Sequence, residues 1–368
     1  MKKILRVTTR LNVGGPSKQI LTLNPLFTGD KYKQIIVTGR VLDSEIEIEL
    51  SNFEKVIKLD ALRRGLNPIN DLKVVLQLML IIKKYQPDII HTHLSKAWAV
   101  TTLARILTRS KSKSVHTFHG HILHSYFSNP VAKVLVFIQK ILASFTDVLV
   151  AVNQIVGDDL IQKGIGNSSQ FVVVQPGFDA CLIIPKAIAR SHLGLDSHGP
   201  VIGYIGRFEA IKRPDVLTEV VKISSELNTG IQFLVCGGGS LYSSFQESTR
   251  DHKVRYLGWT KNLTDFYSSI DLLILTSDNE GSPLAIIEAG LVGIPTLARN
   301  VGGVNSLIQN NFNGFLSGDT PADIFERLKE ILLDTSFLQD VSRNVEMDFK
   351  MRFNANDFLQ KYDAIYSG

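Results

Sequence analysis

Two carboxylates flank a candidate helix start in the segment SDNEGSPLAIIEAG, residues 277–290. Glu280 stands at the edge of a Gly-Ser-Pro turn, and Glu288 follows eight residues later in an apolar helical run. Ser282 is predicted to be the N-cap of this helix and Pro283 its first residue. The exposed amides at such a start bind anions, because the helix dipole favours negative charge there, and a phosphate is the natural occupant.

Both acids of this segment are better suited to hydroxyl groups than to the phosphate, since a carboxylate repels a phosphate. Glu288 is placed to hold a ribose diol, and Glu280 to hold hydroxyls of a group beyond the phosphates. A nucleotide diphosphate-sugar contains these parts in that order. The alternative is a capped surface helix with two solvated acids.

Two cations follow a predicted strand in GYIGRFEAIKRP, residues 203–214. Arg207 and Lys212 together can neutralise a diphosphate without a metal ion. The alternative is an ordinary basic loop. CGGG (236–239) and LGWT, which contains Trp259, also follow strands, and they either admit a nucleotide base against the backbone or are plain turns.

A glycine pair lies in RLNVGGPSKQ, residues 10–19, after the first predicted strand. Gly14 and Gly15 allow the backbone to approach a ligand closely before a helix begins. The segment is not G-x-G-x-x-G, so the dinucleotide-binding fingerprint is absent.

Six of the nine histidines lie between His91 and His124, in HTH (91–93) and HTFHGHILH (116–124). A zinc site is not supported, because there is no H-E-x-x-H motif, no cysteine ligand and no acid at a ligand's spacing. Both clusters close strands at their carboxyl ends, where α/β proteins bind ligands. We therefore expect at least one histidine to face a substrate, with purely structural histidines as the alternative.

Apolar strands alternate with helical segments along the whole chain, which predicts an α/β protein with parallel sheets covered on both faces. The alternation of strands and helices is interrupted once and then begins again. Two Rossmann-like domains facing each other across a cleft are therefore expected. The expected parts are an N-terminal domain (1–177), a linker (178–199), a C-terminal domain (200–350) and a last helix (351–368). The predicted strands are 2–9, 32–39, 87–93, 113–120, 147–153, 170–177, 200–208, 231–239, 254–259, 271–277 and 295–300, and the clearest helices are 72–85 and 131–145.

The composition fits a cytoplasmic protein with a well-buried core, since 44% of its 368 residues are hydrophobic and 20% are charged. Its two cysteines, Cys181 and Cys236, form no motif, which indicates a reducing compartment. The start MKKILRVTTR is expected to be a buried strand rather than a secretion signal. The apolar run at 74–82 is about half of the ~20 residues that a membrane helix needs.

Charge is divided unevenly along the chain. The net charge of residues 1–175, counted as Lys and Arg minus Asp and Glu, is +11, and that of the remaining residues is −6. A basic half indicates an anionic partner, namely a membrane surface, a nucleic acid or a phosphorylated substrate, unless it is simply a lysine-rich surface. Nucleic acid is disfavoured, because interleaved aromatic platforms and a recognition helix are missing. The aromatic and basic segment 125–140 either lies on anionic lipid as a helix or packs its apolar face into the core.

Taken in order, these motifs resemble those of family 4 retaining glycosyltransferases of the GT-B fold, the bacterial glycosyl transferases group 1. The likeness covers nearly the whole chain, including PDIIHTHLSKA, YLGWTKNLTDFYSSIDLLILTS and VGGVNSLI. The residues that carry it are Gly206, Arg207 and Lys212, the pair Glu280 and Glu288, the Gly14-Gly15 loop, and His119 in TFHGH.

The resemblance implies a division of labour in which the second domain binds the nucleotide and the last helix crosses back to the first domain. It implies four catalytic residues: Arg207 and Lys212 on the diphosphate, Glu280 on hydroxyls of the donor sugar, and His119 from the first domain. The implied nucleotide-sugar contacts are Gly14 and Gly15, the backbone near Trp259 for the base, the backbone of Ser282, Pro283, Leu284 and Ala285 for phosphate and sugar, and Glu288 for the ribose.

The chemistry implied by the resemblance is transfer of a hexosyl or N-acetylhexosaminyl group with retention of anomeric configuration. It needs no cofactor or metal, and no Asp-x-Asp motif is present. The expected donor is a UDP-sugar, and the expected acceptor is a saccharide or a polyprenyl-diphosphate-linked saccharide of bacterial surface polysaccharide synthesis, reached at the inner membrane face. The alternatives are a GDP-sugar-dependent transferase and a UDP-sugar 2-epimerase of the same fold. Ser282 stands where the family often has Phe, so the family's preference for a particular donor sugar cannot be assigned to this chain.

Overall fold

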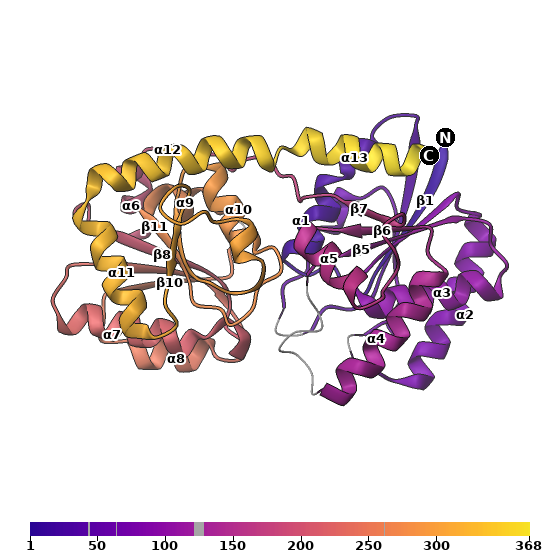
Figure 1. Cartoon of the computed structure of the whole chain (residues 1–368), viewed down its shortest axis with the longest axis horizontal. Coiled ribbons are helices and arrows are strands. Elements are labelled where there is room, and N and C mark those ends of the chain that lie inside the picture. Colours follow the sequence, from indigo (N-terminus) through magenta and orange to yellow (C-terminus); the bar gives the residue numbers. More distant parts are fainter. Residues whose placement is uncertain (43–44, 64, 121–128, 261) are drawn as a thin grey trace. The chain divides into compact units, whose positions relative to one another are not determined.

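The computed structural model describes the whole chain except residues 43–44, 64, 121–128 and 261 (Figure 1). The chain divides into two compact units. Unit 1 contains Met1–Gly177 and Ala355–Gly368, and unit 2 contains Phe178–Asn354. Each unit is a parallel β-sheet with helices on both faces, so the expected α/β class is confirmed.

The sheet of unit 1 has seven strands in the order β3-β2-β1-β4-β5-β6-β7, and every neighbouring pair is parallel. The carboxyl ends of all these strands therefore lie at one edge. The strands are β1 (Lys2–Thr8), β2 (Tyr32–Thr38), β3 (Val56–Lys58), β4 (Ile89–His93), β5 (Lys113–Phe118), β6 (Val148–Ala151) and β7 (Phe171–Val173).

One face of this sheet packs against helices α2 to α5, through clusters that include Leu5, Val37 and Leu149. The other face packs against α1 and α13, through side chains such as Ile36 and Val115. The helices are α1 (Gly15–Thr22), α2 (Pro68–Tyr85), α3 (Ser95–Leu107), α4 (Asn129–Ser144), α5 (Gln154–Gln162) and α13 (Ala355–Ser367), with 3-10 turns η1 (Asn24–Phe27) and η2 (Leu50–Asn52).

The sheet of unit 2 has six parallel strands in the order β10-β9-β8-β11-β12-β13. They are β8 (Val201–Arg207), β9 (Gln232–Gly238), β10 (Val254–Gly258), β11 (Leu272–Leu275), β12 (Thr296–Arg299) and β13 (Phe315–Ser317). Two core clusters cover its faces, one with α7 (Pro214–Glu226), α8 (Tyr242–Thr249) and α11 (Pro321–Leu333), the other with α9 (Thr264–Ser269), α10 (Leu284–Leu291) and α12 (Thr335–Arg352).

All eleven predicted strands are present, and β3 and β13 are two further strands that were not predicted. Each has only three residues and lies at a sheet edge, so it carries too few apolar residues to form a pattern. The expected loose stretch 178–199 contains a helix, α6 (Lys186–Leu193). Its buried Arg190 donates hydrogen bonds to Ser269 O (3.0 Å) and to Asp271 Oδ2 (2.7 Å), which fixes this stretch to unit 2.

A last helix was expected over 351–368, and a last helix is present, but it begins later, at Ala355. Helix α12 continues to Arg352, the chain leaves helical geometry at Phe353 and Asn354, and α13 then begins as part of unit 1. The break lies where Phe353 turns into the core of unit 2, with 1% of its surface exposed.

A buried polar network holds α13 on the sheet of unit 1. Arg6 Nη2 donates to the hydroxyl of Tyr366 (3.1 Å), and His91 Nδ1 lies 2.7 Å from the same oxygen. His91 Nε2 lies 2.8 Å from Thr117 Oγ1, which in turn lies 3.0 Å from the hydroxyl of Tyr362. Arg6 is fully buried, so its charge depends on these hydrogen bonds in place of water.

Replacement of Tyr366 by Phe is expected to lower the free energy of unfolding by about 2 kcal/mol, because it removes the shared hydrogen-bond partner of the buried Arg6 guanidinium and the buried His91 ring. Urea unfolding followed by circular dichroism measures this change. Tyr85→Phe removes a surface hydroxyl at the end of α2 and is the control, with no measurable change expected. Equal stability of the Tyr366→Phe variant and the wild type would show that α13 is held by its apolar contacts alone.

Candidate active site

The carboxyl edge of the second sheet gathers most of the predicted site residues. Arg207 ends β8, and Lys212 ends the 3-10 turn η3 (Ala210–Lys212) directly after it. Glu280 lies in the turn that follows β11, and that turn leads into α10, which carries Glu288. Because β8 and β11 are neighbours in the sheet, the loops that follow them meet.

Lys212 and Glu280 form an ion pair, with Lys212 Nζ 2.5 Å from Glu280 Oε1. Only 7% of the Glu280 side chain and 21% of the Lys212 side chain are exposed. Ser277 Oγ donates a second hydrogen bond to the same carboxylate oxygen, at 2.7 Å. The charge of the buried carboxylate is thus offset by a cation and a hydroxyl group. Lys212 is the more exposed partner of the ion pair.

Hydrogen bonds to backbone carbonyl groups join the two loops that carry this pair. Thr276 Oγ1 donates to Lys212 O (2.9 Å), and the amide of Asp278 donates to Ile211 O (2.9 Å). The amide of Gly303 donates to Glu280 O (2.8 Å), and a Cβ at Gly303 would lie 1.6 Å from a backbone oxygen of the Glu280 turn. A glycine is therefore required in VGGVNSLI so that η4 (Gly302–Ser306) can lie against the turn.

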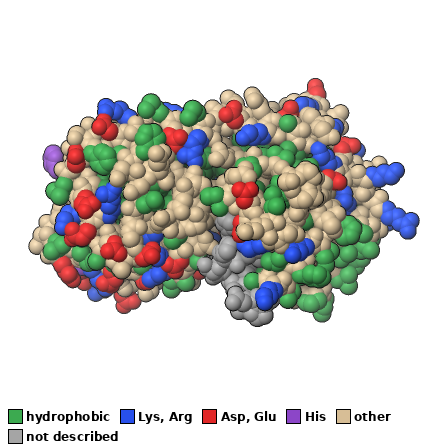
Figure 2. Space-filling model, viewed as in Figure 1, with side chains coloured by type: hydrophobic (Ala, Val, Ile, Leu, Met, Phe, Trp, Pro, Cys, Tyr) green, Lys and Arg blue, Asp and Glu red, His purple; other side chains and the backbone are tan. Residues whose placement is uncertain are grey.

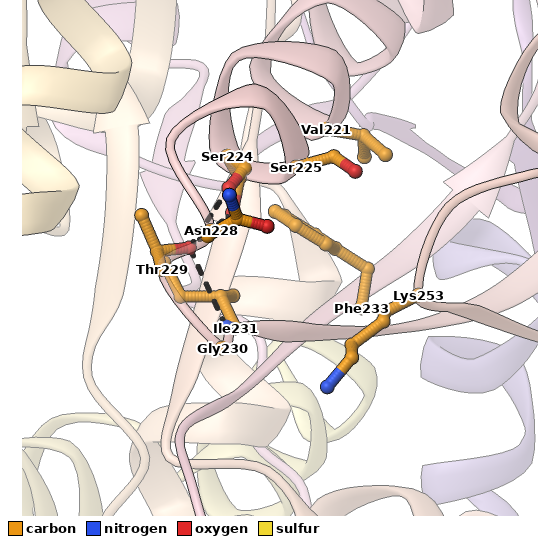
Figure 3. Close-up of a pocket in the computed structure, with 9 residues that line it drawn as sticks. All are labelled: Val221, Ser224, Ser225, Asn228, Thr229, Gly230, Ile231, Phe233 and Lys253. Atoms are coloured by element: carbon orange, nitrogen blue, oxygen red, sulfur yellow. Dashed lines mark hydrogen bonds between the residues drawn. The ribbon is translucent and has the colours of Figure 1, made fainter.

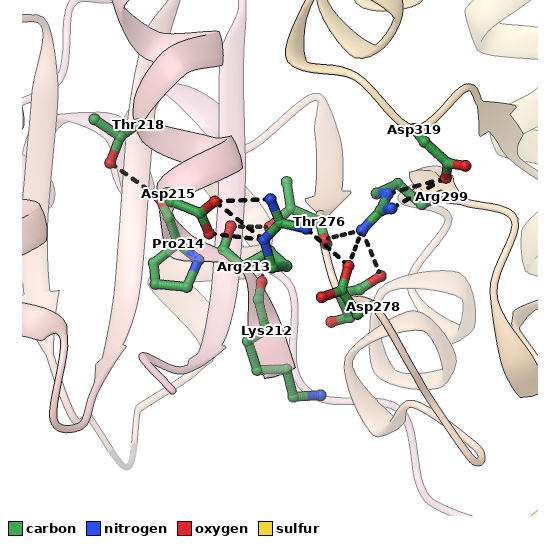
Figure 4. A network of polar contacts seen from close by, with 10 residues as sticks. Lys212, Arg213, Pro214, Asp215, Thr218, Thr276, Asp278, Arg299 and Asp319 are labelled. Atoms are coloured by element: carbon green, nitrogen blue, oxygen red, sulfur yellow. Dashed lines mark hydrogen bonds and ion pairs between the residues drawn. The ribbon is translucent and has the colours of Figure 1, made fainter. Parts of the chain in front are cut away.

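A network of ion pairs holds the turn that contains Asp278 and Glu280 (Figure 4). Arg299, at the end of β12 and 8% exposed, donates to Asp278 and to Asp319 (3.1 Å), and Arg213 also donates to Asp278 (3.0 Å). Hydrogen bonds with Asp215 raise the pKa of Arg213, and the same guanidinium lowers the pKa of the Asp215 carboxyl. The ion pairs of Asp278 with Arg213 and Arg299 could not be predicted from the sequence, because the partners are far apart in the chain.

Helix α10 begins at Leu284, so the prediction of Ser282 as N-cap and Pro283 as first helical residue is wrong. Pro283 has ψ of 112°, which is extended backbone, and it occupies the cap position without a side-chain hydrogen bond. Leu284 and Ala285 form the first helical positions, beside the Glu280 turn.

Glu288 lies in the second turn of α10, where Tyr267 fixes its orientation. The hydroxyl of Tyr267 donates to Glu288 Oε2, at 2.9 Å. Tyr267 is fully buried, and burial together with the neighbouring carboxylate raises its pKa well above the ordinary value, so the hydroxyl remains a donor. Tyr267 lies in the segment YLGWTKNLTDFYSSIDLLILTS, yet its role was not predicted, since its partner is 21 residues away.

Trp259 lies against the end of β9, next to the strand that carries Arg207. A Cβ at Gly238 would lie 2.6 Å from Trp259 Nε1, so the half-buried indole rests directly on this glycine. Gly238 is the register partner of Arg207 between β8 and β9. Gly238 of β9 thus lies between Trp259, which follows β10, and Arg207, which ends β8, at the same edge of the sheet.

In unit 1, the predicted residues follow β1 and β5 at the carboxyl edge of the first sheet. A Cβ at Gly14 or Gly15 would meet no atom within 4 Å, so there is open space beside both. His119 Nε2 lies 2.9 Å from His93 Nδ1, and the rings stack with centroids 5.2 Å apart. The outer nitrogens, His119 Nδ1 and His93 Nε2, are buried and have no hydrogen-bond partner among the described residues.

The remaining described histidines of the two clusters are structural. His91 belongs to the α13 network, and His116 stacks on Trp98 with ring centroids 4.1 Å apart. His121 and His124 lie outside the described residues. Within the described parts of the chain, no group of three or more His, Cys, Asp or Glu side chains is arranged to hold a metal ion.

A surface pocket lies at the opposite end of the second sheet, between the end of α7 and the start of β9 (Figure 3). Thr229 Oγ1 lies 2.7 Å from Ser224 Oγ there, so the pocket wall is held by hydroxyl contacts. Because α/β proteins bind ligands at the carboxyl ends of their strands, this pocket is separate from the candidate site. Its lining is Val221, Ser224, Ser225, Asn228, Thr229, Gly230, Ile231, Phe233 and Lys253.

Two family models together match most of the chain. Residues 13–180 match the model described as Glycosyltransferase Family 4, and residues 185–347 match the model described as Glycosyl transferases group 1. The chain belongs to the family of glycosyltransferases that these two models describe.

Similar proteins agree with this assignment of the glycosyltransferase. The UDP-Gal:alpha-D-GlcNAc-diphosphoundecaprenol alpha-1,3-galactosyltransferase of Escherichia coli is 27% identical over 314 residues, 82% of this chain and 81% of the relative. The capsular polysaccharide biosynthesis glycosyltransferase CapM of Staphylococcus aureus is 22% identical and covers 87% of both chains. The structure of Anabaena HepE in complex with UDP and glucose shares the fold, with a TM-score of 0.83, 18% identity and full coverage of both chains.

The helices that the structure describes in this glycosyltransferase include none with both the length and the hydropathy needed to cross a membrane.

Burial lowers the pKa of His119 to about 3 and holds the pKa values of His91, His93 and His116 well below the ordinary value. These rings stay neutral in the folded glycosyltransferase, whereas in the unfolded chain they bind protons below a pH of about 6.5. The free energy of unfolding therefore falls as the pH drops below about 6.5, and the loss contributed by His119 continues to a pH of about 3.

We expect a loss of about 1 kcal/mol for each of these histidines between pH 7.5 and pH 5.5. Urea unfolding at the two pH values measures it. The His116→Gln variant, which removes one of the four groups, should reduce the difference between the two pH values by about 1 kcal/mol. Identical free energies of unfolding at both pH values in the wild type would contradict buried neutral histidines.

Proposed function

We propose that this glycosyltransferase transfers a sugar from a UDP-sugar to a saccharide or lipid-linked acceptor, with retention of anomeric configuration. The observation that carries the proposal is the Lys212–Glu280 pair beside the start of α10. It places a cation for a diphosphate and a carboxylate for sugar hydroxyls within one hydrogen bond of each other.

In unit 2, Arg207 and Lys212 bind the donor diphosphate. Lys212 keeps its contact with Glu280 and directs its remaining N–H groups at the phosphates, since an ammonium has three donors. The backbone from Ser282 to Ala285 adds amide donors for phosphate and sugar. A divalent metal is not needed, because the two side-chain cations offset the charge of the diphosphate.

Glu288 and Trp259 hold the nucleoside. Tyr267 fixes one oxygen of the Glu288 carboxylate, and the carboxylate accepts hydrogen bonds from the ribose diol. The backbone near Trp259 receives the base, since the indole already covers Gly238 at the end of β9. Glu280 accepts hydrogen bonds from hydroxyls of the donor sugar.

In unit 1, Gly14, Gly15 and His119 contact the sugar and its phosphate. The open space beside both glycines lets the backbone approach the ligand. Because the low pKa keeps His119 neutral, its unpartnered Nδ1 takes part in one hydrogen bond without adding charge. The same edge of the first sheet holds the acceptor.

Transfer proceeds on one face of the sugar. The bond from the anomeric carbon to the diphosphate oxygen breaks, the acceptor oxygen bonds to the same carbon from the same side, and the acceptor proton passes to the departing diphosphate. The negative charge that develops on the diphosphate is stabilised by Arg207 and Lys212, so catalysis depends on position and electrostatics rather than on a cofactor.

The donor and acceptor classes rest on the similar proteins. The Escherichia coli relative is named for UDP-Gal and for an acceptor linked to diphosphoundecaprenol, the Staphylococcus aureus relative for capsular polysaccharide, and HepE was solved with UDP and glucose. We therefore assign this enzyme to bacterial surface polysaccharide synthesis. With a lipid-linked acceptor, the enzyme would catalyse transfer in the cytoplasm, at the inner membrane face.

Ligand-observed NMR with UDP, GDP and ADP, with and without magnesium, tests the donor site. Selective UDP binding that survives chelation and weakens at least tenfold in Glu288→Gln is expected, because an amide replaces one of the two diol acceptors with a donor. Glu247→Gln on α8 is the control. GDP selectivity would redirect the donor class, absence of nucleotide binding would contradict the site, and conversion of a free UDP-sugar without acceptor would indicate an epimerase.

Replacement of Lys212 by Ala is expected to reduce turnover by ~10²-fold or more, on the scale of losing a preorganised charge donor. Release of UDP in the presence of a saccharide acceptor measures turnover. Lys222→Ala removes an exposed lysine from α7 and is the matched control. Near-normal turnover of Lys212→Ala, with wild-type thermal stability, would exclude Lys212 from catalysis.

A further inference from the structure

Helix α2 exposes an apolar stripe to solvent. Ile69, Leu72, Leu76 and Leu80 recur every three or four residues, so they lie on one side of the helix. Each of these four residues has between 53% and 83% of its surface exposed. The opposite side of α2 already fills the core through other residues, including Val75 and Leu78, so the stripe is in excess of what folding needs.

Helix α4 also directs an apolar stripe outward. Val134 is 58% exposed and Phe137 is 64% exposed, and Ile138 and Ile141 continue the same side. Gln139, a polar residue, is 3% exposed and points inward. Of the two alternatives for segment 125–140, packing of the apolar face into the core does not hold for Val134, Phe137 and Ile138, and residues 125–128 lie outside the described residues.

Helix α3 lies between these two helices and contacts both. Its last turns expose three further aliphatic side chains, which connect the stripes of α2 and α4. We call this combined surface the apolar face: Ile69, Leu72, Leu76, Leu80, Leu103, Ile106, Leu107, Val134, Phe137, Ile138 and Ile141. Figure 2 shows hydrophobic side chains gathered over the α2 and α3 part of unit 1. Contiguous exposed apolar surface of this kind marks an interaction site.

The helices that form the apolar face carry mostly positive charge. Helices α3 and α4 contain no acidic residue, and the one acid of α2, Asp71, pairs with Lys96 at 2.6 Å. The exposed cations on the three helices and on the segment that follows α3 are Lys73, Lys83, Lys84, Arg109, Lys111, Lys133 and Lys140. The apolar side chains and the exposed cations therefore belong to the same three helices and the segment that follows α3.

We infer that the apolar face docks on an anionic phospholipid bilayer. Lysine is depleted and aromatic residues are enriched at protein–protein interfaces, whereas ten of the eleven side chains of this face are aliphatic and its helices carry exposed lysines. Lysines extend their charged ends to lipid phosphates while aliphatic side chains enter the boundary between headgroups and acyl chains. This inference rests on the proposed function, because a lipid-linked acceptor is held in such a bilayer.

Sedimentation of the full chain with vesicles of phosphatidylglycerol and phosphatidylcholine tests the inference. Binding that grows with the phosphatidylglycerol fraction is expected. The triple variant Lys73→Gln, Lys83→Gln, Lys133→Gln should lose about fivefold in vesicle affinity per lysine, on the order of 10²-fold in all. Its control replaces three exposed lysines of unit 2, Lys222, Lys329 and Lys350, with Gln.

A second variant tests the apolar part of the face. Leu76→Ser, Leu80→Ser and Phe137→Ser together should lower the vesicle affinity by about tenfold per residue, because each side chain loses its burial in lipid. The control replaces three exposed leucines of unit 2, Leu227, Leu241 and Leu333, with Ser. These side chains are exposed in the fold, so thermal stability should not fall in either variant.

Wild-type protein that stays in solution with phosphatidylglycerol vesicles at low salt, while it still binds UDP, would overturn the docking surface and leave the proposed function standing. Vesicle binding without nucleotide binding would do the reverse. A concentration-dependent dimer that dissociates in the serine variant would overturn the inference in favour of a second copy of this chain. Equal loss of vesicle affinity in the unit 2 controls would also overturn it.

Discussion

The candidate site depends on one geometric constraint, the parallel pairing of every strand in both sheets. Parallel strands end at the same edge, so each strand-to-helix loop of a unit emerges beside its neighbours. This is why Arg207, Trp259 and Glu280 reach one edge, although Arg207 ends β8 and the other two follow β10 and β11. The apolar cores on both faces hold the strands in register, and the loops are free to carry chemistry.

Charge balance is the second requirement of this edge. Glu280 is almost fully buried, and a buried carboxylate without a partner costs several kcal/mol. Lys212 and Ser277 supply the partners, and Asp278, Arg213 and Arg299 hold the same turn through ion pairs of their own. The turn is therefore rigid before any ligand arrives, which reduces the ordering cost of binding.

The sequence predicted the strands well, because a strand covered on both faces must be apolar along its length. Glu280, Glu288 and the cations Arg207 and Lys212 could be singled out as candidates because the motifs that contain them are local. The sequence missed Tyr267, Arg299 and the backbone contact of Gly303, because each acts on a partner that only the fold brings near. Periodicity in α4 showed which residues share a side of the helix, but not whether that side points inward.

The two tryptophans of the chain are divided between the units, and this gives the protein a pair of built-in optical probes. Trp98 is fully buried in unit 1 and stacks on His116, with its Nε1 bonded to Thr146 (3.0 Å). Trp259 is half-buried in unit 2, on the glycine at the end of β9. The blue part of the emission thus reports the interior of one unit, and the red part reports the polarity beside the carboxyl edge of the sheet in the other.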